Sequence, residues 1–180
     1  KTLFTLIEGG YGSASSHYSQ IQGSVNTALP WKSMVATASR GSATVATYTS
    51  VSSSMDDALF DSDLTRCQSQ SNTGTTASRP EAWAKNIISG GGLSHGNNAN
   101  PLDDVWTSAS TGPASDGRLK PDACAYYDNV LTSDLTGTSG YATGDYFTGF
   151  NGTSSATPII AGHVGLIQQL FTDALFGNPL

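Results

Sequence analysis

Positive charge is scarce in this sequence. Its 180 residues contain 8 Lys and Arg against 14 Asp and Glu, which gives a formal net charge of −6 and a pI of about 4.7. No basic run occurs, so the chain lacks the charge pattern with which proteins bind a phosphate backbone, and nucleic acid is not an expected partner. The low charged fraction of 12%, with abundant Ser, Thr and Gly, is more typical of a secreted protein than of a cytosolic one.

Cysteines and long apolar runs are also nearly absent. Cys67 and Cys124 are too few for a disulfide framework and lack the Cys/His spacing of a zinc site, so we expect both to be small buried side chains. No apolar stretch reaches the roughly 18 residues that cross a membrane. The polar Glu8 interrupts the apolar start, which argues against a signal peptide in residues 1–10. The sequence therefore predicts neither membrane insertion nor an export signal of its own.

Short β-rich and helical patterns alternate along the chain. Residues 50–60 place apolar side chains at helical spacing after several serines, which predicts a helix. Four runs rich in apolar and β-branched residues predict strands, namely 2–7, 33–38, 64–68 and 83–89. We expect the three glycines at 90–92 to end the last of them. Strand, helix and strand in this order predict crossover connections, a parallel sheet and one α/β domain over residues 1–180.

A helix near the C-terminus carries the first candidate for chemistry. From Thr157 to Phe171 apolar residues occupy nearly every helical face, which is typical of a helix surrounded by protein. Pro158 is tolerated in the first turn, so we expect the helix to begin within about one residue of Ser154. Ser154 and Ser155 would then lie where free N–H groups stabilise negative charge. Ser154 is a candidate nucleophile beside an oxyanion site; the alternative is that both serines only cap the helix.

The residues around Ser154 resemble the serine motif of the subtilisin-like serine proteases, the subtilases. Residues 152–158 are Gly-Thr-Ser-Ser-Ala-Thr-Pro, against Gly-Thr-Ser-x-Ala-x-Pro in the family, and a helix with small residues follows. The resemblance assigns Ser154 to the position of the nucleophile and Ser155 to the variable position. Residues 83–91 and 112–122 resemble two further blocks of the family that orient the core.

Two earlier blocks resemble the family's oxyanion turn and substrate strand. Asn72, within Ser-Asn-Thr-Gly, resembles the Asn of the Ala-Gly-Asn-x-Gly turn, which donates to the oxyanion; the alternative is an ordinary turn residue. Ser39, Arg40 and Gly41 stand where subtilases have Ser-Leu-Gly or Ser-Trp-Gly. In subtilases, the strand with this motif lines the pocket for the substrate residue before the cut bond. An arginine there argues against the pocket's usual apolar preference.

The sequence also departs from the family. The small residue pair before Asn72 is replaced by Gln70 and Ser71, and Ala-Pro-Gly does not follow residues 120–122, which indicates a divergent branch. The motifs that carry the catalytic Asp and His, Asp-Ser-Gly or Asp-Thr-Gly and His-Gly-Thr, do not occur. Because the resemblance is clearest over residues 34–180, it implies the C-terminal half or more of a catalytic domain. The N-terminal part would be missing, lost or supplied separately.

None of the three histidines lies in the sequence context of the missing base. His163 follows Ser154 by nine residues on one predicted helix, about 13 Å along its axis. His95 lies in a Gly/Asn loop after the block at 83–91, and His17 lacks the glycine-rich helix start that the family has. We therefore expect the chain alone to have no peptidase turnover.

The resemblance implies a serine endopeptidase domain with a parallel central sheet and helices on both faces. Protein or peptide would be the substrate, and a complementing N-terminal segment or propeptide a candidate partner. No cofactor is required. Structural calcium, which many subtilases bind, stays open, although Asp56, Asp57, Asp61 and Asp63 lack the spacing of a calcium loop and favour a solvated helix face. The rival interpretation is a domain that has lost the triad and binds partners without cleaving them.

Overall fold

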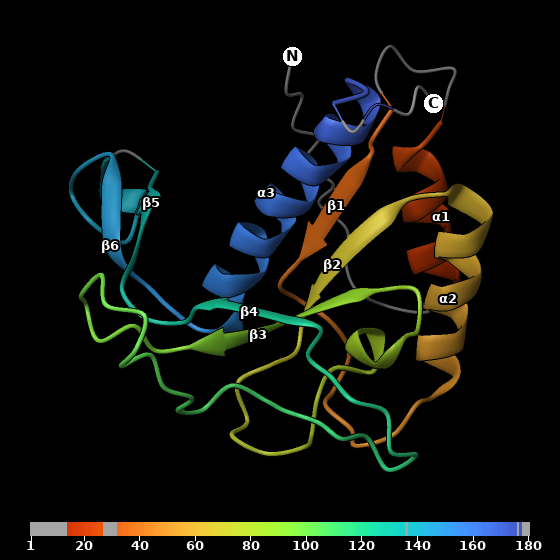
Figure 1. Ribbon diagram of the computed structural model, residues 1–180, viewed down its shortest axis with the longest axis horizontal. Helices are drawn as coiled ribbons and strands as arrows, with labels where there is room; N and C mark the ends of the chain where they lie inside the picture. Colours follow the sequence, from red (N-terminus) through yellow and green to blue (C-terminus); the bar gives the residue numbers. More distant parts are fainter. Residues whose placement is uncertain (1–13, 27–31, 136, 176, 178–180) are drawn as a thin grey trace.

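Four parallel strands form the central sheet, in the order β1-β2-β3-β4, in this computed structural model (Figure 1). The structure describes residues 14–26, 32–135, 137–175 and 177. The strands are β1 (Val35–Ala38), β2 (Thr65–Ser69), β3 (Ile88–Leu93) and β4 (Ala123–Tyr126). Ala38 pairs with Gln68, and Gly90 pairs with Ala123. Because all four strands run in one direction, the loops that follow them gather at one edge of the sheet.

Helices cover both faces of this sheet (Figure 1). α3 (Thr153–Thr172) packs against all four strands on one face, whereas α1 (Ala14–Ser24) and α2 (Ser50–Ser62) pack together on the other. Two apolar clusters match these layers. In β1, Val35 packs with the cluster of α3 and Ala36 with that of α2, as the alternation of a strand requires. The predicted α/β fold, with a parallel sheet and helices on both faces, is confirmed.

The remaining described elements lie outside the four-stranded sheet and the three α-helices. They are the 3-10 helices η1 (Pro80–Trp83) and η2 (Gly137–Ser139) and the strands β5 (Val130–Ser133) and β6 (Tyr146–Phe150). β5 and β6 form an antiparallel hairpin that lies apart from the main sheet. Along the chain, the hairpin follows β4 and directly precedes α3.

Local chemistry explains α2 and the strands beside it. Thr49 caps the helix: its side chain accepts from the Val51 N–H, and the Ser52 hydroxyl accepts from the Thr49 N–H. This confirms the helix predicted over 50–60. β1 lies within the run predicted at 33–38, and β2 overlaps the run predicted at 64–68 and ends one residue later. The strand predicted at 2–7 falls outside the described residues.

The prediction that residues 90–92 end a strand is wrong, because these glycines form the middle of β3. A Cβ on Gly90 would lie 2.6 Å from Thr157 Oγ1 of α3, and one on Gly91 would meet Pro121. The glycines therefore allow close approach of neighbouring segments rather than a turn. The strand itself begins late: residue 83 still belongs to η1, so the expected strand entry over 83–89 is only partly correct.

α3 is buried over its first half only. Its buried residues are Thr153, Ser155, Ala156, Thr157, Ile160 and Ala161. Farther along, Leu166 is 60% exposed and Phe171 is 48% exposed. The predicted burial on all sides is thus wrong for the second half, in the residues that the structure describes. No described helix is long and apolar enough to cross a bilayer.

The two cysteines lie in different environments, and both are free. Cys67 is fully buried against α3, and this burial raises the pKa of its thiol to about 11. Cys124 is exposed because it lies on β4, the last strand in the order of the sheet, and does not belong to the cluster beneath α3. The expectation of two buried cysteines is correct for Cys67 and wrong for Cys124.

Candidate active site

α3 begins at Thr153, directly before Ser154, as predicted. Gly152 precedes the helix with a φ of 88°, a conformation that favours glycine. A Cβ at this position would lie 2.9 Å from Asn72 Nδ2, so a larger residue has no room. The Gly152 N–H donates to the Tyr127 carbonyl at 2.7 Å. The start of α3 is thereby attached to the edge where β4 ends.

Pro158 leaves one carbonyl of α3 without its helical hydrogen bond. It is the sixth residue of α3, beyond the first turn in which it was expected. Because proline has no N–H, the Ser154 carbonyl lacks the donor that a helix normally provides four residues later. Ser39 Oγ donates to this carbonyl instead, at 3.2 Å. The lost helical bond is thus replaced by a contact that holds Ser39 beside Ser154.

The side chain of Asn72 contacts the first residue of α3. Asn72 Oδ1 accepts hydrogen bonds from the Thr153 N–H at 2.8 Å and from Thr153 Oγ1 at 3.0 Å. Since both partners are donors, the oxygen faces Thr153 and Nδ2 remains available to donate elsewhere. The fold therefore brings together the two residues that the sequence singled out, although they are far apart in the chain.

Two hydrogen-bond donors at the start of α3 have no partner in the described part of the chain. One is the Ser154 N–H in α3, and the other is Nδ2 of Asn72, which contacts Thr153 from the turn after β2. The Ser154 hydroxyl likewise bonds to no described residue. Ser155 differs, because it is buried and its hydroxyl donates to the Gly152 and Tyr126 carbonyls. A carbonyl oxygen that gained negative charge near the free donors would be stabilised. Of the two serines, only Ser154 has a hydroxyl free to react.

Side chains from neighbouring elements hold the segment after β1. Gln68 Nε2 donates to the Arg40 carbonyl at 2.9 Å, and Arg79 Nη1 donates to the Gly41 carbonyl at 3.0 Å. Ser39 contacts Ser154 as described above. Of the three residues predicted to line the substrate pocket, Ser39 therefore contacts Ser154, the Arg40 and Gly41 carbonyls are held by hydrogen bonds, and Arg40 is exposed.

The turn that carries Asn72 includes a strained residue. Ser71, where the family motif has glycine, adopts a φ of 121°. A side chain in such a conformation costs on the order of 1–3 kcal/mol. Hydrogen bonds on both sides hold the turn in place: the Ser71 carbonyl accepts from the Ser110 N–H, and the Gln70 N–H donates to the Gly90 carbonyl. The strain is thus retained by the surrounding structure.

A His–Asp pair joins the segments that follow β3 and β4. His95 Nδ1 lies 2.7 Å from Asp128 Oδ1, and the Ser94 hydroxyl donates to Asp128 Oδ2. Burial by itself would raise the pKa of the Asp128 carboxyl, but hydrogen bonds from the His95 N–H, the His95 ring and Ser94 lower that pKa overall. The His95 ring also stacks on Tyr126. These contacts give His95 a structural role between two loops.

No described histidine side chain is hydrogen-bonded to Ser154. His163 is exposed on α3, and its Nδ1 lies 2.9 Å from the Ile159 carbonyl. His17 belongs to α1, and its side chain lies outside the described residues. The described part of the site thus contains a hydroxyl and two donors for an oxyanion, and it contains no general base in contact with that hydroxyl.

The block at 112–122 supports the sheet rather than the reacting groups. Lys120 Nζ lies 2.6 Å from Asp122 Oδ2 and donates to the Ile87 carbonyl at 3.0 Å. The same carboxylate accepts from the Ser89 N–H at 2.7 Å. These bonds join β3 to the start of β4. The block therefore orients the core, as its resemblance implied.

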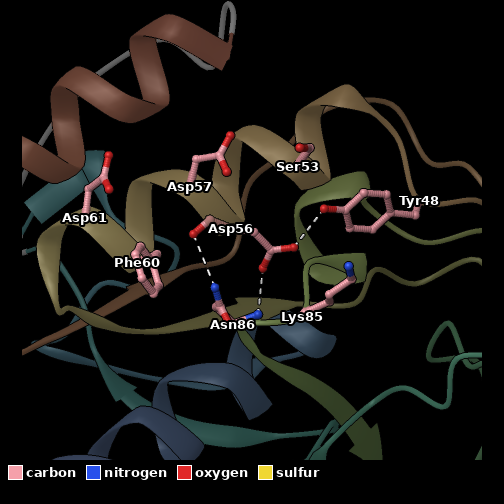
Figure 2. Close-up of a pocket in the computed structure, with 8 residues that line it drawn as sticks. All are labelled: Tyr48, Ser53, Asp56, Asp57, Phe60, Asp61, Lys85 and Asn86. Carbon is pink, nitrogen blue, oxygen red and sulfur yellow. Dashed lines mark hydrogen bonds between the residues drawn. The ribbon is translucent and has the colours of Figure 1, made fainter.

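The acidic residues of α2 line a separate pocket of about 500 Å³ (Figure 2). Asp56 accepts hydrogen bonds from the Asn86 N–H and the Tyr48 hydroxyl, so it supports the fold. Asp61 accepts from the Tyr18 hydroxyl. Among the described residues, no group of three or more His, Cys, Asp or Glu side chains could hold a metal ion.

The order of these elements and the sequence of the site agree with one family. A sequence model of the subtilase family matches residues 6–177. The chain belongs to the subtilase family. The family that the sequence resembled is thereby confirmed.

Solved subtilase-like structures share this fold. The prenylagaramide maturation protease PagA is 14% identical, with a TM-score of 0.65 over 97% of this chain and 55% of that chain. The self-cleaved protease domain of PatA is 14% identical, with a TM-score of 0.64 over 93% of this chain and 54% of that one. Sphericase is 21% identical, with a TM-score of 0.59 and coverages of 84% and 48%. The subtilase chain described here spans about half the length of these proteins.

Sequence reasoning missed two contacts that orient this subtilase site. Thr153 fixes the Asn72 amide, and Ser39 replaces the hydrogen bond that Pro158 cannot make. The sequence contained a signal for each contact, since Thr153 and Pro158 are part of the serine motif at 152–158. What those two positions contact could not be known before the fold.

Proposed function

We propose that this chain is the nucleophile-bearing part of a serine endopeptidase. Ser154 Oγ attacks the carbonyl carbon of a peptide bond, and the carbonyl oxygen becomes an oxyanion that Asn72 Nδ2 and the Ser154 N–H bind. Collapse of this intermediate expels the amine and leaves an ester on Ser154, which water then hydrolyses. The observation that carries the proposal is the pair of hydrogen bonds from Thr153 to Asn72 Oδ1, because they leave Nδ2 free to donate.

The reaction needs a base for the hydroxyl proton of Ser154. That base accepts the proton during attack and returns it to the leaving amine, which is the usual task of a histidine oriented by an aspartate. The described residues place no such group at Ser154. We propose that a complementing N-terminal segment supplies both residues, and that proteins or peptides outside the cell are the substrates.

Two open features support a complementing segment. β1 is the first strand in the order of the described sheet, so its outer backbone groups are free to pair with a further strand. On the same side, α3 packs against β1 and exposes Leu166 and Ile167 beyond its buried half. A strand and helix added there would cover apolar surface and bring new side chains to the edge where Ser154 lies.

A catalytically inactive binding domain is the second candidate. It is favoured by one observation, the lack of a base in contact with Ser154 among the described residues. The two functions predict different reactivity of the Ser154 hydroxyl.

The test is active-site labelling with a sulfonyl fluoride. The chain is expressed alone and together with the segment encoded upstream of Lys1, and the modified residue is located by peptide mapping. We expect labelling of Ser154 and cleavage of casein in the complemented protein, abolished by Ser154→Ala and kept by Ser155→Ala. The chain alone should show neither. Equal labelling of Ser155 would overturn the assignment of Ser154 as the nucleophile, and no labelling in the complemented protein would favour the binding domain.

A further inference from the structure

Arg40 directly follows Ser39, the residue that contacts Ser154. Ser39 Oγ donates to the Ser154 carbonyl at 3.2 Å, and Gln68 Nε2 donates to the Arg40 carbonyl at 2.9 Å. The backbone of Arg40 is therefore held at the site while its side chain is exposed. An aliphatic or aromatic residue is usual at this position of the motif, so the guanidinium is a particular feature of this chain.

The charge of Arg40 is not neutralised by the described part of the protein. No described carboxylate forms an ion pair with it. Glu81, the carboxylate beneath the same segment, accepts from the Ser42 N–H at 2.9 Å and from the Ser42 hydroxyl at 2.7 Å. Arg79 adds a second guanidinium, bonded to the Gly41 carbonyl. The segment is therefore locally positive in a chain whose net charge is −6.

A guanidinium presents parallel N–H groups that match a carboxylate in a bidentate pair. An extended peptide advances about 3.3 Å per residue, so a substrate side chain beside Arg40 belongs to a residue close to the attacked bond. We propose that Arg40 determines specificity by pairing with an Asp or Glu side chain of the substrate, on the N-terminal side of the cut bond. This inference rests on the proposed peptidase function and names its substrate class, acidic peptides.

The test compares alanine-based peptides that carry Glu, Gln or Lys at one of the four positions before the cut. The complemented protein should cleave the Glu peptide about 3- to 10-fold faster than the Gln peptide in kcat/KM at one or more positions, with Lys slowest. The preference should weaken as salt rises, because counterions screen an exposed pair.

Two substitutions at Arg40 sharpen the test. Arg40→Leu should remove the preference for Glu, and Arg40→Glu should reverse it in favour of Lys. Lys85→Glu is the matched control: it makes the same change of charge at an exposed residue of the pocket in Figure 2, above the Tyr48 ring. This control should keep the wild-type preference. A reversal in Lys85→Glu as well would assign the preference to overall charge and overturn the role of Arg40.

Failure of this inference differs from failure of the peptidase function. Cleavage of all peptides at equal rates would overturn the role of Arg40 and leave the peptidase intact. If no peptide is cleaved and Ser154 is not labelled, the peptidase proposal fails, and binding decides the question for Arg40. Fluorescein-labelled, amidated peptides are then titrated with the 180-residue chain. Tighter binding of the Glu peptide that Arg40→Leu abolishes would support the proposal, whereas equal affinities would overturn it.

Discussion

The two halves of α3 belong to one continuous helix and have opposite surroundings. In the first half, Thr157 and Ile160 are buried against the sheet, and Thr157 Oγ1 donates to the Thr153 carbonyl. In the second half, Leu166 and Ile167 are more than half exposed. Residues of the described sheet, its loops and the turn at Asn72 surround the first half. The second half has apolar side chains with no comparable cover among the described residues.

The two halves of α3 therefore differ in what they contribute to the candidate site. The start of α3 around Ser154 is held by hydrogen bonds to Asn72, Ser39 and Tyr127, all of which the described chain contains. The second half of α3 takes no part in these hydrogen bonds. We therefore expect changes near Ser154 to reduce catalysis strongly, and changes in the second half to have small effects on the chain alone.

The largest expected effect is that of Asn72 on catalysis in the complemented protein. Asn72→Ala should lower kcat by about 10²–10³ with little change in KM, because the amide binds the oxyanion only in the transition state. Steady-state kinetics on a peptide substrate provide the measurement.

Asn72→Asp separates the two roles of this side chain. Aspartate keeps an oxygen that accepts from Thr153 and loses the donor, so its kcat should fall at least as far as that of Asn72→Ala. Its stability should be higher than that of the alanine variant. Wild-type kcat in Asn72→Asp would remove Asn72 from the oxyanion hole.

The next effect compares the two halves of α3 directly. Ile160→Ala should lower the free energy of unfolding by about 2–5 kcal/mol, because it leaves a cavity between α3 and the sheet. Leu166→Ala should change it by about 0.5 kcal/mol or less, since that side chain is 60% exposed. Urea unfolding of the 180-residue chain measures both. Equal losses would show that the second half is packed as well as the first.

The smallest effect concerns the strained turn before Asn72. Ser71→Gly should raise the free energy of unfolding by about 1 kcal/mol, because glycine adopts the φ of 121° without strain. The same change in a regular strand, Ser133→Gly in β5, should lower stability instead. If Ser71→Gly destabilises the chain as Ser133→Gly does, the turn is not strained.

Much of the fold and the site followed from local sequence. The helix at 50–60 and the strands at 33–38 and 64–68 were predictable because their apolar spacing and their capping or turn residues lie within each segment. The contiguous motif at 152–158 likewise singled out Ser154. The role of the glycines at 90–92 was not predictable, because it depends on α3 and Pro121, which come later in the chain.

The sequence by itself determined the α/β order of elements, the family and the residue that bears the candidate nucleophile, because each is carried by a short continuous pattern. Only the tertiary structure decided which atom of Asn72 faces Thr153, why Ser39 contacts Ser154, and which half of α3 is buried. Those features depend on contacts between residues that are far apart in the chain. Local patterns do not specify such contacts, because the distance between two segments is set only when the sheet and its helices pack together.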